Sequence, residues 1–246
     1  MMAGLGWRMR ALTGAGAWAA WAVGTTILIS TGWQGGGVLA VFFVASTAVS
    51  RVLPPKVNAQ DAKGDRRDAW QVLANGSVAA GGALFGLAEP ALGMWLLTVS
   101  LAASASDTWA TAVGTWSGKT PRDLRTGLSV APGTSGGVTV PGTIGAIGGA
   151  TVVATSGAVV AESLGLLLAG TLLGLLGMAV DSLLGGAAQG RFYCPECERP
   201  TERSVHRCGA PAILKKGWRW FSNDLVNFCA IAVAAFTGWA VWQWWP

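Results

Sequence analysis

The chain has 246 residues, of which 52% are hydrophobic and 12% are charged, and its net charge at pH 7 is +5. Because charged residues make up roughly a quarter of ordinary soluble domains, this composition excludes a typical soluble enzyme and favours a protein embedded in a lipid bilayer. The basic surplus is a signal of membrane topology, and we expect no nucleic acid among the partners.

Long stretches without charged residues predict the membrane spans. No charge occurs between Arg10 and Arg51 or between Arg125 and Glu162, and a helix needs ~20 apolar residues to cross a bilayer. We therefore expect an all-α, polytopic transmembrane helix bundle that forms a single membrane domain over residues 1–246. The predicted spans cover residues 11–31, 37–52, 70–88, 91–114, 138–160, 163–188 and 223–244.

The N-terminal segment has basic residues followed by an apolar run, a pattern that a signal peptide shares. The apolar run continues to Ser50, interrupted only by Thr31–Gly37. This length favours an uncleaved helical hairpin with a turn over Thr31–Gly37, and a cleaved signal peptide is the alternative.

The distribution of Lys and Arg predicts the orientation in the membrane. Two of the seventeen precede the first span, Arg51 lies at the boundary of the second span, and the others lie in three loops, residues 53–69, 115–137 and 189–222. The alternate loops contain none. The positive-inside rule places these segments and the N-terminus in the cytosol. We expect a multi-pass protein of the cell (inner) membrane whose active face is cytosolic, where a basic rim attracts anionic lipids or phosphorylated substrates.

Glycines recur at helical spacing in the fifth and sixth predicted spans. Small residues at such spacing let membrane helices approach closely, so we expect a compact bundle. These glycines are Gly142, Gly145, Gly149, Gly170, Gly174 and Gly177.

Three acids occur within or at the ends of predicted spans. Asp107 lies eighteen residues beyond Glu89, and Asp181 lies nineteen beyond Glu162, so both are ~27 Å from the exoplasmic surface. Asp224 opens the last span at the cytosolic boundary. Ionisable groups are costly in a bilayer, which makes them candidates for a functional site; the alternative is that each acid pairs with a nearby Lys or Arg.

Amide side chains are predicted in the same layer. Asn75 lies near the cytosolic end of the third span, and Asn223 and Asn227 lie near that of the last span, which also carries Asp224. Carboxylate and amide oxygens suit Mg²⁺, which is usually held by one or two carboxylates together with substrate phosphates. We therefore expect Asp107 and Asp181 to bind Mg²⁺ together with Asp224.

A loop rich in Gly, Thr and Ser precedes the fifth span. Within residues 130–143, backbone N–H groups and hydroxyls ahead of a helix N-terminus can bind phosphate, and Lys119 and Arg122 lie nearby in the sequence. The loop is not a Walker A motif, because no Gly-Lys-Ser/Thr follows. The candidate phosphate-binding residues of the loop are Gly133, Thr134, Ser135, Gly136 and Gly137.

Five ordered motifs resemble one membrane family. They are Arg67–Gly76, Ser106–Gly114, Pro132–Gly137, Asp181–Gly185 and Asn223–Phe228. The chain resembles the integral membrane family of formerly unknown function that includes the plant phytyl-phosphate kinase. That family is similar in turn to phytol and dolichol kinases and to the CTP-using phosphatidate cytidylyltransferase.

The resemblance implies a phosphotransferase. It would use a nucleoside triphosphate such as CTP to convert an isoprenoid or phytyl-type lipid monophosphate into the diphosphate. The family pattern has a glutamate where this chain has Ala112, which leaves the number of metal ions open. By this resemblance the catalytic residues would be Asp107, Asp181, Asp224, Asn75, Asn223 and Asn227.

Two other functions remain open from the residues alone. Intramembrane acids also bind the cations of a cation-coupled transporter or carrier, although transport sites usually lie near the midplane of the bilayer. A nucleotidyltransferase that acts on a lipid phosphate would use the same constellation of acids.

The last cytosolic loop, residues 189–222, contains a Cys/His motif. Cys194, Cys197, His206 and Cys208 have the residue types and the Cys-x₂-Cys spacing of a structural Zn²⁺ site. The alternative is a set of reduced thiols without a metal, since disulfides are rare in the cytosol. The fourth cysteine, Cys229, lies in a span, where we expect it to pack.

Overall fold

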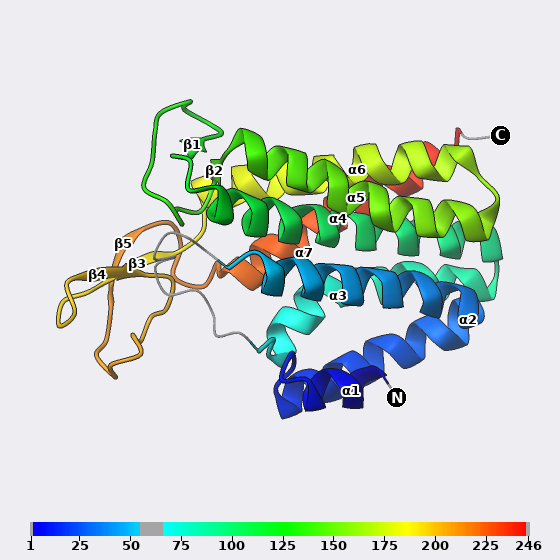
Figure 1. Ribbon diagram of the computed structural model, residues 1–246, viewed down its shortest axis with the longest axis horizontal. Helices are drawn as coiled ribbons and strands as arrows, with labels where there is room; N and C mark the ends of the chain where they lie inside the picture. Colours follow the sequence, from blue (N-terminus) through cyan, green and yellow to red (C-terminus); the bar gives the residue numbers. More distant parts are fainter. Residues whose placement is uncertain (1, 55–65, 245–246) are drawn as a thin grey trace.

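The computed structural model describes residues 2–54 and 66–244, which are mainly helical (Figure 1). Two basic residues that contribute to the topology prediction, Lys56 and Lys63, lie outside the described residues. A short 3-10 helix, η1 (Phe85–Leu87), follows α3. The α-helices are α1 (Met2–Arg8), α2 (Gly14–Val52), α3 (Ala69–Leu84), α4 (Pro90–Ser117), α5 (Val140–Ala161), α6 (Leu164–Ala187) and α7 (Asn223–Trp242).

The helices follow the predicted spans. Among the described residues, α2, α5, α6 and α7 are long and apolar enough to cross a membrane. α2 has 39 residues and is interrupted at Gly32, where φ is 65° and ψ is −164°, so its two halves form the predicted hairpin (Figure 1). α3 with η1, and the 28-residue α4, occupy the two remaining spans. The all-α polytopic bundle is confirmed.

The predicted turn over Thr31–Gly37 is wrong in its extent. Within α2 only Gly32 leaves the helical conformation, and residues 33–37 already belong to the second half of the helix. A Cβ at Gly35 would lie 2.8 Å from Leu97 Cδ2. This glycine therefore allows α2 to pack closely on α4, and packing keeps a glycine-rich stretch helical.

α4 is the central helix of the bundle. Its residues 92–106 are all buried, and it contacts α2, α3, α5, α6 and α7. A Cβ at Gly149 of α5 would lie 2.7 Å from the carbonyl oxygen of Ala105, and a Cβ at Gly174 of α6 would lie 3.1 Å from that of Ala102. These contacts confirm the close packing that the glycine spacing predicts.

The end of the bundle that carries the turns α3–α4 and α5–α6 is tightly connected. A Cβ at Gly93 would lie 2.3 Å from the Cα of Gly86, so the backbones of α4 and η1 are in direct contact. The α5–α6 turn consists of Glu162, with φ of 49°, and Ser163, whose hydroxyl caps α6. There is no room for a domain at this end of the described chain.

Four helices begin at the opposite end, and each has a side-chain N-cap. A helix N-terminus carries a partial positive charge. The beginnings of α3, α5 and α7 therefore create an environment that favours anions. The caps are Thr13 for α2, Asp68 in a capping box with Gln71 for α3, Thr139 for α5 and Ser222 for α7.

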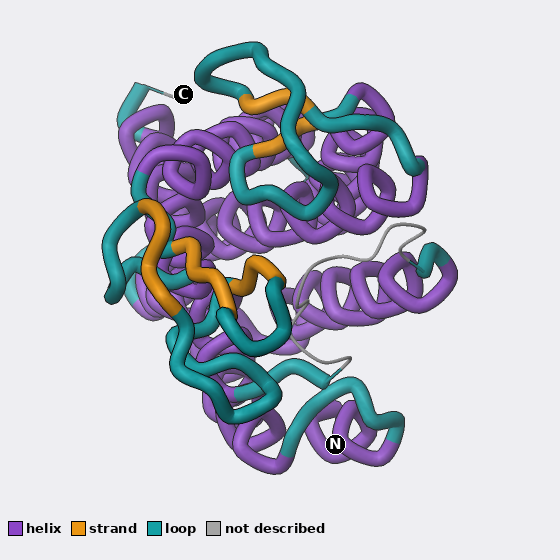
Figure 2. The backbone as a smooth tube through the Cα atoms, turned by 90° about the vertical axis from the view of Figure 1, so that its left-hand side faces the viewer, coloured by secondary structure: helices purple, strands orange, loops and turns teal. Residues whose placement is uncertain are grey.

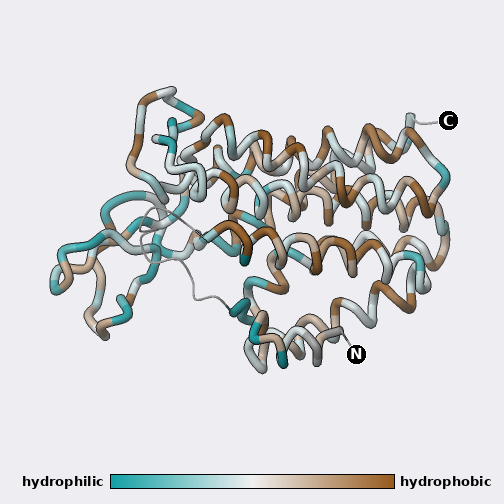
Figure 3. The backbone as a smooth tube through the Cα atoms, viewed as in Figure 1, coloured by the Kyte–Doolittle hydropathy of each residue, from teal (hydrophilic) through white to brown (hydrophobic). Residues whose placement is uncertain are grey.

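Two small antiparallel sheets cover this end of the bundle (Figure 2). The sequence pattern does not predict the strands, which are only two to four residues long. Figure 3 shows that polar residues are concentrated in this region, whereas the helices are largely apolar. The first sheet pairs β1 (Arg122–Asp123) with β2 (Gly137–Val138), and the second has the order β4 (Arg199–Thr201), β3 (Arg191–Cys194), β5 (Ile213–Lys216).

Candidate functional site

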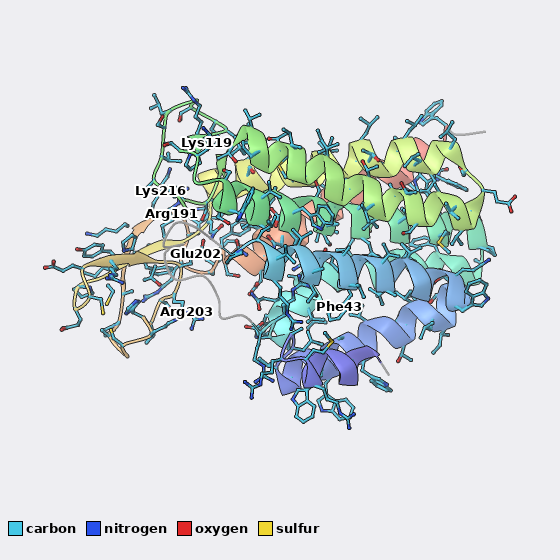
Figure 4. The ribbon with its side chains drawn as sticks, viewed as in Figure 1. Phe43, Lys119, Arg191, Glu202, Arg203 and Lys216 are labelled. Carbon is cyan, nitrogen blue, oxygen red and sulfur yellow. The ribbon has the colours of Figure 1, made fainter. Side chains whose placement is uncertain are left out.

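A cavity of about 500 Å³ lies between the helix ends and the small sheets. Its walls come from α2 to α7, from the loop before β2 and from the segment that carries the second sheet. Figure 4 shows Lys119, Arg191 and Glu202 around this end of the bundle. Small-molecule sites typically have volumes of about 300–1,000 Å³, so the cavity can hold a ligand of moderate size.

The three predicted acids come together in this cavity. Asp107 on α4, Asp181 on α6 and Asp224 in the first turn of α7 all line it, and each is half-buried. Asp107 and Asp181 also line a second, smaller void beneath the cavity. Carboxylates from three helices thus share one polar space near the end of the bundle.

The three predicted amides line the same cavity. With its nitrogen oriented toward α6, the Asn227 side chain donates a hydrogen bond of 2.7 Å to Asp181 Oδ2. Asn75 Nδ2 donates to the backbone oxygen of Gln71 over 2.8 Å, and the backbone oxygen of Asn75 accepts a hydrogen bond from Ser104. These contacts fix α3 against α4 and α7 against α6 at the depth of the acids.

The Gly133–Gly137 loop borders the cavity as two consecutive turns. Thr134 N donates to Ala131 O, Gly137 N donates to Thr134 O, and Gly133 and Gly136 have φ of 81° and 85°. A positive φ at the third residue of a turn is the signature of type II, which favours Pro and then Gly at the two central positions. The Pro-Gly-Thr-Ser-Gly sequence therefore favours these two consecutive turns through its own backbone preferences.

The loop is held against the end of α6. A Cβ at Gly136 would lie 2.6 Å from the Cα of Gly186. Arg125 Nη1 donates to Gly186 O over 2.8 Å, and the backbone N–H of Arg125 donates to Asp123, which lowers the pKa of that carboxyl group. Close backbone packing on Gly186 and the hydrogen bonds of Arg125 thus hold the loop beside the cavity.

Of the two predicted phosphate-binding cations, Lys119 lines the cavity, whereas Arg122 is not among the described residues that do. The Arg122 guanidinium donates to Gly127 O over 3.1 Å within its own hairpin, which explains why it does not contribute to the wall. Arg67 lines the cavity instead. Burial lowers the pKa of Arg67 from its usual value, but an arginine remains charged at physiological pH.

The sequence contains one partial signal for Arg67, because this residue directly precedes Asp68, the N-cap of the helix that carries Asn75. Backbone hydrogen bonds hold it in place, from Arg67 N to Ala11 O and from Thr13 N to Arg67 O. The sequence alone does not show that Arg67 lines the cavity, because this placement depends on the contact between the N-terminal segment and the beginning of α3.

Glu202 and Gln189 also line the cavity and were not predicted. Glu202 Oε1 accepts hydrogen bonds from Gln189 Nε2 (2.8 Å) and Ser135 Oγ (3.0 Å). Arg191 donates to the backbone oxygen of Ser135. These contacts join the second sheet to the Gly133–Gly137 loop, called the turn loop below. No local sequence signal points to them, because the partners are 56 and 67 residues apart.

Ala112 lines the cavity on α4. A glutamate at this position, as in the family pattern, would add a carboxylate to the wall that Asp107 occupies. Its replacement by alanine reduces the oxygen donors available there.

The four predicted zinc ligands form a compact cluster. Their sulfur and nitrogen ligand atoms all lie within 4.8 Å of one another. A hydrogen bond with His206 lowers the pKa of Cys208 to about 6, and a hydrogen bond with Cys208 raises the pKa of Cys197 to about 11. Hydrogen bonds therefore connect the groups of the cluster, while Cys229 lies separately on α7.

The bundle and its polar cavity define a polytopic membrane protein with a site at one end. The chain belongs to the integral membrane protein family DUF92, whose family model matches residues 1–235.

Three relatives are similar to this chain. An uncharacterized membrane protein of Methanocaldococcus jannaschii is 32% identical over 60% of this chain and 62% of its own length, less than two thirds of the relative. Protein PGR of Arabidopsis thaliana is 26% identical over 86% of this chain and 82% of its own length. An uncharacterized membrane protein of Synechocystis is 26% identical over 85% of this chain and 74% of its own. No solved structure gives a significant match.

Proposed function

We propose that this protein is a Mg²⁺-dependent kinase that transfers the γ-phosphoryl group of a nucleoside triphosphate, such as CTP, to an isoprenoid or phytyl-type lipid monophosphate. The observation that carries the proposal is the meeting of Asp107, Asp181 and Asp224 with the Gly133–Gly137 loop around one cavity. The motifs that resemble the family of the plant phytyl-phosphate kinase supply most of this wall.

The donor set fits Mg²⁺. The wall offers carboxylate and amide oxygens from α3, α4, α6 and α7, and Mg²⁺ prefers oxygen ligands and retains positions for substrate phosphates. Asp107, Asp181 and Asp224 would hold the ion. When bound, it would neutralise negative charge on the phosphates that meet in the cavity.

The chain's other groups would position two anionic substrates. Arg67 and Lys119 supply positive charge at the wall, and the beginnings of α3, α5 and α7 add partial positive charges. In the reaction, an oxygen of the lipid phosphate attacks the γ-phosphorus, and the bond to the β–γ bridging oxygen breaks. The nucleoside diphosphate leaves with that electron pair.

No general base is required, because the attacking oxygen is already anionic. The catalytic task is then positioning and electrostatic stabilisation. The apolar tail of the substrate would remain among the helices in the bilayer, with its phosphate at the depth of the carboxylates. The cavity suits a substrate with an apolar tail and a phosphate head, since its wall contains Leu53 and Met178 as well as the polar residues.

A labelling experiment with purified protein in lipid vesicles tests the proposal. Phytyl monophosphate and Mg²⁺ are supplied with CTP or ATP labelled at the γ- or the α-phosphorus. A kinase places γ-label in a lipid diphosphate, and a nucleotidyltransferase places α-label in the lipid. Transfer of neither label, for any of the triphosphates tried with phytyl, geranylgeranyl and shorter prenyl phosphates, would contradict the proposal.

The position of the cavity favours the kinase over a cation-coupled carrier. The acids meet at one end of the bundle, beside the loops, whereas transport sites usually lie near the bilayer midplane. A carrier would instead move cations across vesicles that contain the protein, with no transfer of label.

A further inference from the structure

The Cys/His cluster lies outside the cavity and has no part in the proposed phosphoryl transfer. Cys194 Sγ and Cys208 Sγ are 3.7 Å apart, and His206 Nδ1 lies 3.1 Å from Cys208 Sγ. Thiolates bound at about 2.3 Å to a tetrahedral zinc are about 3.8 Å apart. The geometry points to a structural Zn²⁺ site formed by Cys194, Cys197, His206 and Cys208 that holds the rim of the cavity in place.

The distances argue against the other common fate of neighbouring cysteines. A disulfide has a sulfur–sulfur distance of about 2.05 Å, much shorter than the 3.7 Å between Cys194 and Cys208. Three sulfurs and one nitrogen that face a common point are instead the Cys₃His donor set of structural zinc sites.

Two backbone turns present the ligands. Cys194 ends β3, and the turn to β4 passes through Glu198, which has a positive φ of 51°. At the second turn Gly209 has φ of 89°, and its N–H donates to His206 O over 2.9 Å. Both turns bring a ligand pair to one side of the sheet, so the arrangement depends on local backbone conformation rather than on a chance approach of side chains.

The segment also needs a source of stability other than an apolar core. Within residues 189–222 the buried hydrophobic side chains are Phe192, Cys194, Ala212 and Phe221, and all four residues of β5 are exposed. Small units with so little buried apolar surface usually depend on disulfides or a metal. A zinc ion would supply this cross-link.

The cross-link would act on the rim through Glu202. Glu202 lies in the sequence between Cys197 and His206, directly after β4, and its Oε1 accepts from Gln189 and from Ser135 of the turn loop. Binding of all four ligands to one ion would hold the chain on both sides of Glu202, at Cys197 and at His206. The ion thereby fixes the side chain that connects the second sheet to the loop beside the cavity.

Metal content tests the site without reference to activity. Full-length protein, purified in detergent without chelators, should contain about one zinc per chain. C194S and C208S should lose the metal, whereas C229S, which changes the one cysteine outside the cluster, should retain it. X-ray absorption of the wild-type protein should show sulfur neighbours at about 2.3 Å from zinc.

Limited trypsin digestion tests the structural role. Arg203 and Arg207 lie between the ligands, and neither is followed by proline. Removal of zinc with a chelator should therefore speed cleavage there by at least tenfold, and added zinc chloride should restore protection. C229S should behave like the wild type.

Two results would overturn the inference. One is a reduced wild-type protein that neither contains zinc nor takes it up from zinc chloride. The other is a purified protein whose mass is lower by two hydrogen atoms, which would indicate a disulfide. Neither result bears on the labelling experiment, so the zinc site and the kinase can fail independently.

Discussion

The hydrogen bond from Asn227 to Asp181 Oδ2 shows how single residues prepare the cavity. The amide fixes the orientation of a carboxylate that comes from a different helix. Such fixed groups contribute most to catalysis when they face charge that is already present or develops in the reaction.

The carboxylates are therefore the first residues to change. We expect D107N and D181N to lower kcat by about 10²-fold or more, because an amide binds Mg²⁺ more weakly than a carboxylate of nearly the same shape. The measurement is γ-label transfer in vesicles. E89Q is the matched control, since Glu89 is an exposed acid at the opposite end of the bundle.

Circular dichroism should show that the two variants remain folded. If both turn over at the wild-type rate at limiting Mg²⁺, the carboxylates do not hold the ion and the proposed role of the cavity is wrong.

Arg67 and Arg122 make a second pair for comparison. Arg67 lines the cavity, whereas Arg122 donates to Gly127 O in its hairpin. We expect R67Q to raise the KM for the triphosphate by about 10-fold or more, the effect of losing a charge-assisted contact worth about 1.5–3 kcal/mol. R122Q should change KM less than about twofold, on the scale of a surface contact. Equal effects of the two changes would argue against Arg67 as the phosphate-binding cation.

The sequence predicts which acids and amides meet in the cavity, because helical spacing fixes their depth; their role in a reaction stays a prediction. Asp107 and Asp181 are nearly equidistant from the charged turns at the other end, and the structure places both in one cavity. Helical spacing does not predict three other residues of the cavity wall, because they lie in segments outside the helices: Arg67, Gln189 and Glu202. Arg122 shows the reverse error, because closeness in sequence to a loop does not determine where a long side chain points.

At the scale of elements, two glycines with positive φ differ in their surroundings: Gly136 in the Gly133–Gly137 loop and Gly118 at the end of α4. Gly136 has φ of 85°, and a Cβ there would lie 2.6 Å from Gly186 Cα. Gly118 has φ of 68°, with no atom within 4 Å of an added Cβ.

We therefore expect G136A to destabilise the protein by at least about 1 kcal/mol more than G118A, because only Gly136 combines backbone strain with a steric clash. Thermal unfolding in detergent measures the difference. Equal midpoints for the two variants would show that the loop does not rest on α6 as described.

The helices were more predictable than the strands for a physical reason. A transmembrane helix needs about 20 apolar residues without charge, which leaves a long and unmistakable pattern. The strands near the cavity are only two to four residues long. Although β3 alternates between half-buried and buried residues, a run this short does not identify a strand in the sequence. The extent of the first turn was also misjudged, because glycine marks both turns and close helix contacts, and at Gly35 it marks the contact.

For the whole molecule, the gathering of basic segments at the cavity end gives a test of orientation. The Arg51 side chain donates to Met9 O, and Arg66 donates to Leu12 O over 2.9 Å, so the N-terminal segment, the end of α2 and the beginning of α3 meet at one end. By the positive-inside rule we expect this end to face the cytosol.

Cysteine labelling in intact cells measures this orientation. With a membrane-impermeant maleimide, E89C should react without lysis, whereas T126C should react only after lysis. Both positions are exposed, so a difference reports the side of the membrane rather than burial. Labelling of T126C in intact cells would place the cavity on the outer face.

The contact between Gly86 and Gly93 also has a mechanical consequence. It joins the two helices that carry Asn75 and Asp107 at the end farthest from the cavity, and the contact is too close to slide. A change in the angle between α3 and α4 would therefore be a rotation about this point, and its displacement would grow along the helices. Asp107 is fourteen residues beyond Gly93, or about 21 Å along the axis, so a rotation of about 10° shifts it by about 4 Å. The hydrogen bond from Ser104 Oγ to Asn75 O opposes such a rotation, so the two helices are held together at both ends of their shared length and Asn75 stays beside Asp107.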